Sequence, residues 1–209
     1  MVGRKKKYLK SNACSGLYQS VRFGPMEYFS RREHDAMLLL DMTPAVRALR
    51  AQPETFNLGI KGRGRHYTPD FLVELFDGSV LWFEIKHLDY MVRHPQLDGR
   101  QPRIEAFCAL RGGRFILWTD TEIYRQPRWH NARRLRAAVG HVTAEREAAI
   151  LEICRAHGFP VPFGTVIDAA GEDLQLIEAA LGLCALGRLV LDLDRPIAPD
   201  AKLLAGLEP

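Results

Sequence analysis

The sequence lacks several features that mark particular classes of protein. It contains no long apolar run free of charged residues, so no membrane-spanning segment is expected. The basic start "MVGRKKKYLK" is not followed by the apolar core of a signal peptide, so secretion is not expected. No internal repeat and no low-complexity tract is found. These absences favour a cytoplasmic globular protein.

Cysteine is scarce as well. The four cysteines, Cys14, Cys108, Cys154 and Cys184, are far apart, and no CxxC pair occurs among them. This spacing argues against a zinc site. Buried free thiols in a reducing cytoplasm are the simplest interpretation.

What is present is ordinary for a soluble protein. The 209 residues are 47% hydrophobic and 26% charged, which allows one large domain or two small ones. The net charge of +4 is compatible with a nucleic-acid partner without indicating one by itself.

The N-terminal third predicts a loose arm and then a helix. Residues 1–20 are predicted to form a basic arm, and the five basic residues among the first ten suit either phosphate contact or a solvated tail. Ser30 followed by Glu33 matches a capping box, and the apolar residues after it predict a helix that ends near Leu40.

The stretch "YTPDFLVELFDGSVLWFEIK" predicts a β-hairpin that turns at Asp77-Gly78. A three-residue loop, Asp77-Gly78-Ser79, sets Val73 opposite Phe83 and makes one face of the hairpin wholly apolar. The same register places Asp70 opposite Lys86 on the other face, with Glu84 two residues along.

The rest of the chain predicts two further units of structure. Residues 103–113 and 114–120 are typical of a helix and a strand, and this strand, helix, strand order indicates a mixed sheet. Residues 128–139 predict a basic helix. After residue 141 the pattern predicts three helices and a small β-wing, which together describe a winged-helix domain. We therefore expect an α/β domain over residues 21–141 and a winged-helix-like domain over residues 142–209.

Asp70, Glu84 and Lys86 carry chemistry if they share one side of the hairpin. Two converging carboxylates repel each other unless a cation lies between them, and oxygen ligands favour Mg²⁺ or Mn²⁺. A metal ion with a lysine beside it suits phosphodiester hydrolysis. A structural ion pair between Asp70 and Lys86 is the alternative that spacing alone leaves open.

Pro69-Asp70 followed by Glu84-Ile85-Lys86 resembles the PD-(D/E)XK nuclease motif. The surrounding segments "EYFSRREHDAMLLLDMTPAVRALRAQPETF", "YTPDFLV", "FEIK" and "TDTEI…HNARRL" resemble, in order, the N-terminal domain of the TnsA family. The similarity spans Phe23 to Leu135, and the C-terminal residues are similar to that family's winged-helix domain. The resemblance implies a restriction-endonuclease-like mixed sheet flanked by helices.

The resemblance also implies roles for individual residues. Glu33, Asp70 and Glu84 match the family's metal-binding carboxylates, and Lys86 matches its catalytic lysine. Because one side chain can hardly be both cap and ligand, Ser30 is expected to cap the helix without a return bond from Glu33. Gln52-Pro53 matches a position interpreted as structural. His34 and His66 are interpreted as DNA-facing or incidental.

TnsA-family proteins are endonuclease subunits of heteromeric transposases, in bacterial cytoplasm and on the nucleoid when active. The resemblance implies a Mg²⁺- or Mn²⁺-dependent enzyme that nicks double-stranded DNA at transposon ends. It implies a DDE-type transposase subunit and an AAA+ ATPase regulator as partners. Six arginines are predicted to contact phosphates without reading sequence: Arg63, Arg65, Arg128, Arg133, Arg134 and Arg136.

Two other functions stay open at the level of sequence. One is a stand-alone restriction or repair nuclease, and the other is a non-catalytic DNA-binding or assembly module. The segment 171–187 contains three acidic residues and no lysine or arginine, which is a poor match to a groove-reading helix. We expect it to dock a protein, so that deletion of residues 142–209 affects partner binding more than DNA cleavage.

Overall fold

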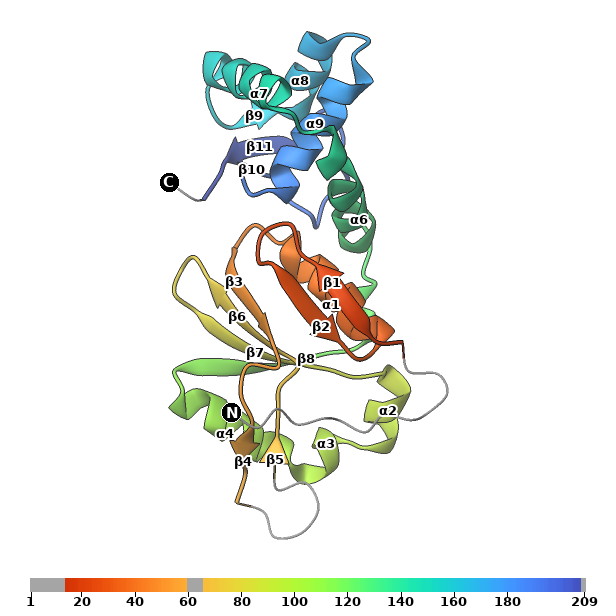
Figure 1. Ribbon diagram of the computed structural model, residues 1–209, viewed down its shortest axis with the longest axis vertical. Helices are drawn as coiled ribbons and strands as arrows, with labels where there is room; N and C mark the ends of the chain where they lie inside the picture. The colour runs from red at the N-terminus through yellow and green to blue at the C-terminus, as the bar shows by residue number, and fades with distance from the viewer. Residues whose placement is uncertain (1–13, 60–65, 208–209) are drawn as a thin grey trace.

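The structure is a computed structural model that describes residues 14–59 and 66–207. Two units are stacked along the long axis of the molecule (Figure 1). The lower unit is built on a four-stranded sheet, and the upper unit contains the C-terminal helices and a three-stranded sheet. The predicted mixture of helices and strands is confirmed.

The four-stranded sheet has the strand order β3-β6-β7-β8. Its strands are β3 (Val46–Ala51), β6 (Phe71–Leu75), β7 (Val80–Ile85) and β8 (Gly113–Trp118). The first three strands are antiparallel, and β8 runs parallel to β7. The connection from β7 to β8 passes through α2 (Leu88–Arg93), α3 (Gln96–Gly99) and α4 (Gln101–Leu110). The predicted mixed sheet is therefore confirmed.

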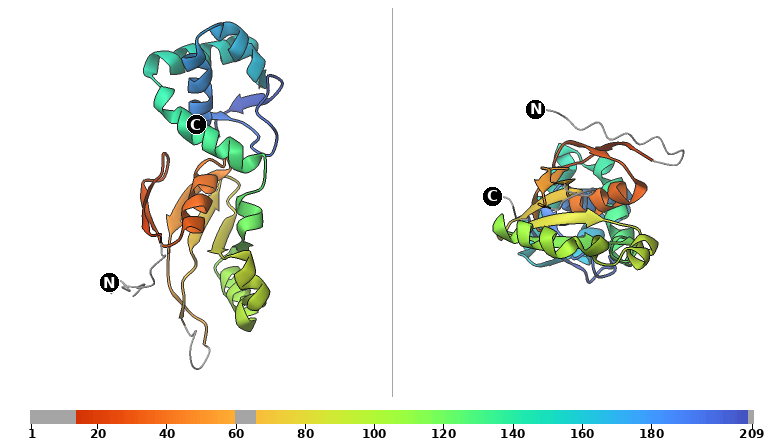
Figure 2. Two further views of the ribbon diagram at one scale, coloured as in Figure 1. Left: turned by 90° about the vertical axis from the view of Figure 1, so that its right-hand side faces the viewer. Right: turned by 90° about the horizontal axis from the view of Figure 1, so that it is seen from below.

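Helices cover both faces of this sheet (Figure 2, left). Phe71 and Phe83 belong to the core that contains α1 (Arg31–Asp41). Leu72 and Trp82, which alternate with them along the strands, pack with Ile104 and other residues of α4. A small hairpin of β4 (Phe56–Asn57) and β5 (His66–Tyr67) extends the second cluster.

The β6–β7 loop contains three residues, as predicted, but at a different position. It is Phe76-Asp77-Gly78, because the N–H of Leu75 bonds to the Ser79 carbonyl at 2.9 Å. Gly78 has a φ of 84°, and the third residue of such a loop must adopt this left-handed conformation. The predicted loop, Asp77-Gly78-Ser79, would have placed serine there instead.

The shifted loop changes the register of the hairpin but not its faces. Val73 pairs with Leu81, whereas the sequence prediction set it opposite Phe83. The displacement is two residues, and side chains alternate with a period of two, so each side chain keeps its predicted face. The apolar face was therefore predicted correctly, and the pairing of Asp70 with Lys86 was wrong.

Part of the predicted N-terminal arm is a strand. β1 (Gly16–Gln19) pairs with β2 (Pro25–Tyr28), whereas residues 1–13 lie outside the described residues. The last residue of α1, Asp41, anchors this hairpin. Its buried carboxylate accepts hydrogen bonds from the Tyr18 hydroxyl at 2.9 Å and the Ser20 hydroxyl at 2.8 Å.

The upper unit combines helices with short strands. The elements are α5 (Asp120–Ile123), which leads out of the sheet, then α6 (Arg128–Ala138), η1 (Val139–His141), α7 (Ala144–His157), β9 (Val161–Pro162), α8 (Phe163–Ala170), α9 (Leu174–Ala185), β10 (Leu189–Val190) and β11 (Lys202–Ala205). The strand order of the small sheet is β10-β11-β9.

Helix α9 is the central element of the upper unit. Residues 179–185 are all buried, and α9 packs against α6, α7, α8 and η1. Gly182 permits this approach, because a Cβ there would lie 2.7 Å from the carbonyl oxygen of Ala138. The predicted boundary at residue 141 falls between η1 and α7, but α6 already packs on α9.

Two expectations from composition can be compared with the structure. Cys108, Cys154 and Cys184 are buried free thiols, whereas Cys14 is free but exposed. Among the helices of the described residues, none is long and apolar enough to cross a membrane.

Candidate active site

The side chains of Asp70, Glu84 and Lys86 come together where β6 begins and β7 ends. Phe71 pairs with Phe83, and the N–H of Asp70 also donates to the Phe83 carbonyl at 2.9 Å. Two successive residues therefore oppose one residue of β7, which is the arrangement of a β-bulge. The bulge turns the Asp70 carboxylate toward β7, where its Oδ2 accepts the Ile85 N–H at 2.8 Å.

The ammonium group of Lys86 lies between the two carboxylates. It forms an ion pair with Glu84 Oε1, and its Nζ is 4.0 Å from Asp70 Oδ2. It also donates to the Ile85 carbonyl at 3.1 Å. Asp70 and Glu84 are buried, with 8% and 6% of their surfaces exposed, so the lysine balances charge that water does not reach.

The electrostatics of this cluster are those of a site that attracts cations. Burial and the neighbouring charge of Glu84 raise the pKa of Asp70 to about 8, although Lys86 opposes this change. Burial alone would lower the pKa of Lys86, but the charges of Glu84 and Asp70 outweigh it and raise that pKa. Asp70 therefore keeps its proton to a higher pH than an ordinary carboxyl does, unless a further cation joins the site.

Tyr67 completes the surroundings of Glu84. Its buried hydroxyl donates to Glu84 Oε2 at 2.7 Å, while Glu84 Oε1 faces Lys86. Burial and the charge of Glu84 raise the pKa of Tyr67. No motif in the sequence pointed to Tyr67 as part of the site. A tyrosine three residues before the motif aspartate offers no signal of its own, because the contact depends on how β5 folds against β7.

Glu33 does not join the two carboxylates. Its Oε2 accepts the Phe29 N–H at 2.8 Å, and its Oε1 accepts the Ser30 hydroxyl at 3.1 Å. Ser30 in turn caps α1 through the Glu33 N–H. The Glu33 carboxylate thus meets the Ser30 hydroxyl and the N–H of the residue before it, whereas the return bond of a capping box would go to the N–H of Ser30 itself. Glu33 is nevertheless near enough for its charge to raise the pKa of Asp70.

Residues 43–120 match the family model described as the TnsA-like endonuclease N-terminal domain. Within these residues the chain is therefore similar to a TnsA-like endonuclease domain. The predicted family resemblance is thus confirmed, and the match includes Asp70, Glu84 and Lys86, whereas Glu33 precedes it. The mixed sheet flanked by helices fits a nuclease-like fold. No curated protein matches the chain.

A TnsA-like domain implies nuclease activity, with DNA and a transposase as partners in general terms. Within residues 14–59 and 66–207, no group of three or more His, Cys, Asp or Glu side chains is arranged to hold a metal ion. Two carboxylates are sufficient for Mg²⁺, which usually keeps several waters and takes one or two carboxylates plus substrate phosphate. Asp70 and Glu84 fit that requirement.

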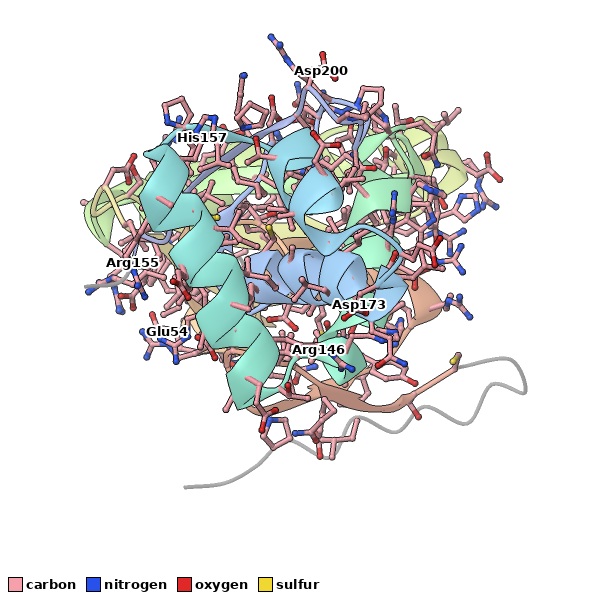
Figure 3. The ribbon with its side chains drawn as sticks, turned by 90° about the horizontal axis from the view of Figure 1, so that it is seen from above. Glu54, Arg146, Arg155, His157, Asp173 and Asp200 are labelled. Carbon is pink, nitrogen blue, oxygen red and sulfur yellow. The ribbon has the colours of Figure 1, made fainter. Side chains whose placement is uncertain are left out.

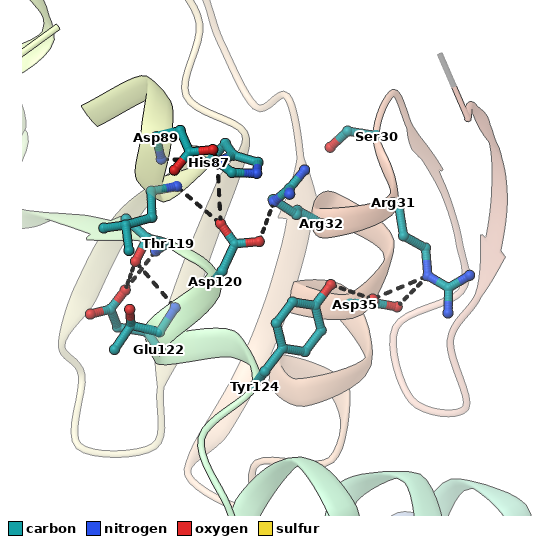
Figure 4. Close-up of polar contacts among 12 residues, drawn as sticks. Ser30, Arg31, Arg32, Asp35, His87, Asp89, Thr119, Asp120, Glu122 and Tyr124 are labelled. Carbon is teal, nitrogen blue, oxygen red and sulfur yellow. Dashed lines mark hydrogen bonds and ion pairs between the residues drawn. The ribbon is translucent and has the colours of Figure 1, made fainter. Parts of the chain in front are cut away.

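A second polar cluster links α1 to α5 and to the segment that follows Lys86 (Figure 4). Asp120, which begins α5, pairs with Arg32 Nε at 2.5 Å and accepts the Leu88 N–H at 3.0 Å. Arg32 precedes Glu33 on α1, and Leu88 lies two residues after Lys86. Asp120 therefore ties the helix of Glu33 to the end of the strand that carries Glu84.

The two histidines near the motif have different environments. His34 Nδ1 lies 2.9 Å from Asp35 Oδ1, and its ring packs edge-on against those of Tyr18 and Tyr28. This environment supports the incidental interpretation for His34. His66 lies exposed in β5, where contact with DNA is sterically open.

Most of the predicted DNA-binding arginines that the structure describes are held by other protein groups. Arg128 donates to the Thr43 hydroxyl at 3.0 Å, and burial lowers its pKa. Arg134 pairs with Glu178 at 3.3 Å. These contacts give both arginines structural roles in the packing of α6.

The remaining arginines differ in accessibility. Arg136 donates to the Gln19 carbonyl at 3.2 Å. Arg133 is exposed, with its guanidinium 5.9 Å from the centre of the Trp129 ring. Arg63 and Arg65 lie outside the described residues. Of the four described arginines, Arg133 is thus the best placed to meet a phosphate.

Proposed function

We propose that the chain is a metal-dependent DNA endonuclease that nicks at transposon ends as a subunit of a heteromeric transposase. The observation that carries this proposal is the convergence of Asp70, Glu84 and Lys86 within the segment that matches the TnsA-like model. Its partners would be a DDE-type transposase subunit and an AAA+ ATPase regulator.

In this proposal Asp70 and Glu84 hold Mg²⁺ or Mn²⁺. Such an ion, when bound, polarises a phosphoryl oxygen and lowers the pKa of a bound water. Two buried carboxylates beside each other resist joint ionisation, and the raised pKa of Asp70 expresses that resistance. Binding of a divalent cation therefore requires Asp70 to lose its proton, and affinity should increase as the pH rises toward 8.

Lys86 supplies a fixed positive charge at the same place. Its ammonium is held by Glu84 and the Ile85 carbonyl, so its position is set before substrate arrives. A preorganised donor of this kind stabilises the negative charge that develops on the phosphate oxygens or on the attacking water. The raised pKa of Lys86 keeps the group protonated throughout the physiological range.

Replacement of Tyr67 by phenylalanine is expected to weaken Mn²⁺ binding by about 10-fold, because groups that orient a metal ligand are worth about 10–100-fold in affinity. The ring remains in its cluster with Phe56, at a centroid distance of 5.9 Å, so the fold should persist. Titration calorimetry with Mn²⁺ measures the effect. Tyr90→Phe, whose ring stacks on His94, is the matched control. Equal affinities in wild type and Tyr67→Phe would contradict the role of the hydroxyl.

We also propose that the upper unit is a winged-helix domain that docks a protein partner. The order of α7, β9, α8, α9, β10 and β11 supports this class. Helix α9 occupies the centre of the unit, so it is not free to enter a DNA groove. Seen from above (Figure 3), the basic residues Arg146 and Arg155 lie on α7, and Asp173 marks the start of α9.

Truncation at residue 141 is a poor test of this docking role. It would strip α9 from α6 and expose Leu135 and Ala138, which are 1% exposed in the whole chain. A single exposed position is better suited. Leu174, at the first turn of α9, is 71% exposed and follows Glu172 and Asp173, so it presents an apolar side chain beside two acidic residues.

Leu174→Arg is expected to reduce co-purification with the ATPase or transposase encoded beside this chain by at least about 10-fold, since one buried anchor commonly contributes 2 kcal/mol or more. Leu110→Arg, at an 86% exposed position of α4, is the matched control. The nicking rate on DNA should be the same in both variants. If Leu174→Arg co-purifies with the partner as well as wild type does, the first turn of α9 is not part of the docking surface.

A further inference from the structure

A cavity of about 430 Å³ opens beside the nuclease site, between β2 and the end of β3. Its lining includes Phe23, Pro25, Met26, Glu27, Gln52 and Pro53. Small-molecule sites in proteins typically measure about 300–1,000 Å³, so the cavity is large enough for a compact ligand. Neither the TnsA-like match nor the proposed role of Asp70 assigns a function to it.

Gln52, in the wall of this cavity, is hydrogen-bonded to Asp70, the residue that precedes β6. Ala51, the last residue of β3, pairs with Phe71, and the N–H of the next residue, Gln52, donates to the Asp70 carbonyl at 2.9 Å. Gln52 thus lies across the ladder from Asp70.

Gln52 has two properties that a purely structural residue would not need. Its φ of 45° is left-handed, a conformation that glycine adopts without steric cost and glutamine does not. Its side-chain Nε2 is shielded from solvent and has no hydrogen-bond partner among the described residues. Strain and an unused donor at one residue that lines a cavity indicate a function in binding.

The lining matches a nucleobase better than a phosphate. Phe23, Met26 and Pro53 offer apolar surface for a flat ring, and the carboxamide of Gln52, once turned toward the cavity, would offer a donor and an acceptor for the edge of that ring. Glu27 would repel a phosphate but can accept from an exocyclic amine. Arg50, which also lines the cavity, already pairs with Glu74 at 2.6 Å.

We propose that this cavity binds one unpaired nucleobase of the DNA strand next to the nick, with the Gln52 carboxamide contacting its edge. The inference rests on the proposed endonuclease function and adds a subsite to it. Extrusion of a base from a duplex costs least near a frayed or distorted step, and an apolar cavity with a polar wall offsets that cost. The subsite would fix the register of the strand relative to Asp70.

The test compares Gln52→Gly with wild type in the full chain, together with its transposase partner if nicking requires it. The probes are duplexes that lack a single base at successive positions around the nick. Gln52→Gly is expected to nick intact DNA about 10-fold more slowly than wild type. On the duplex that lacks the bound base the two proteins should nick at equal rates, because the contact no longer exists in either.

Gln96→Gly is the matched control, since Gln96 also has a left-handed backbone, with a φ of 50°. Both glycine variants relieve backbone strain, so their melting temperatures should equal or exceed that of wild type. A Gln52→Gly protein that nicks intact DNA at the wild-type rate would overturn the proposal. So would a deficit that stays the same on every base-deleted duplex. A wild-type chain that neither binds nor nicks DNA would instead contradict the endonuclease function itself.

Discussion

Asp70→Asn is expected to abolish metal-dependent nicking, by at least about 10³-fold, without unfolding the protein. The amide has the shape of a protonated carboxyl, a form that burial and Glu84 favour because they raise the pKa of Asp70 to about 8. It can still accept the Ile85 N–H, which lies 2.8 Å from Asp70 Oδ2. What it cannot do is offer a negative charge to a divalent cation.

Two measurements check this prediction. A plasmid-nicking assay with Mg²⁺ or Mn²⁺ gives the rate, and Mn²⁺ calorimetry gives the loss of binding. Asp200→Asn, at an exposed position of the upper unit, is the control that should match wild type in both. If Asp70→Asn nicks at the wild-type rate, Asp70 is not part of a metal-dependent nuclease site.

Lys86→Ala distinguishes the role of the lysine ammonium from that of the two carboxylates. Removal of the ammonium should lower the nicking rate by about 10²–10³-fold, the usual effect of losing one preorganised electrostatic donor. Mn²⁺ binding should persist, because Asp70 and Glu84 remain and the competing cation is gone. Lys202→Ala, at an exposed position of β11, is the matched control. Loss of Mn²⁺ binding in Lys86→Ala would show that the lysine organises the carboxylates rather than the reaction.

The raised pKa of Asp70 predicts how the free energy of unfolding depends on pH. The pKa of Asp70 is higher in the folded protein than its ordinary value of 3.8. A carboxyl of this kind stabilises the fold fully below its ordinary pKa, and that stability is lost as the pH rises through about 8. The free energies of unfolding of metal-free wild type and Asp70→Asn should therefore diverge between pH 4 and 8, with the wild type falling relative to the variant.

The largest loss of stability is expected at Asp41. Replacement by alanine removes a fully buried acceptor from the hydroxyls of Tyr18 and Ser20 and from the N–H of Val21 at 3.0 Å, and it leaves Arg22 without the carboxylate 3.8 Å from its Nε. Breaking such a buried network costs about 3–5 kcal/mol. Since the network ties the β1–β2 hairpin to α1, the hairpin should loosen first.

Urea unfolding gives the free energy of this change, and hydrogen exchange at the amides of Gly16–Gln19 reports on the hairpin. Asp200→Ala, at an exposed carboxylate, is the control and should lie within about 0.5 kcal/mol of wild type. If Asp41→Ala also loses less than about 1 kcal/mol, the bonds to Asp41 are not what holds the hairpin on α1.

The alternation of apolar residues was sufficient to predict which side chains share a face of the β6–β7 hairpin. It could not predict the pairing, because registers that differ by two residues bury the same side chains. The position of Gly78 decides between them, since only the third loop residue needs a left-handed backbone. The bulge at Asp70 has no such signal, and it decides how Asp70 meets Glu84.

Contacts between distant parts of the chain were beyond prediction for a related reason. Asp41 and Tyr18 are 23 residues apart, and Glu84 and Tyr67 are 17 apart. Each pair depends on a turn or a crossing that the local pattern leaves open. Glu33 shows the converse, because its pairing with Ser30 was visible in the sequence and the two residues bond to each other locally. The basic pattern of α6 also did not reveal that Arg128 and Arg134 are held by protein groups.

Helix α6 touches α1 on one side and α9 on the other, and one continuous hydrophobic core runs from Phe83 to Leu181. The two units are therefore joined by packed side chains rather than by a flexible tether. A protein bound to the upper unit would hold the carboxylates at a set distance from itself. The molecule would then act as a rigid spacer, in which the length of α6 fixes the distance between the docking point and the position of the DNA cut.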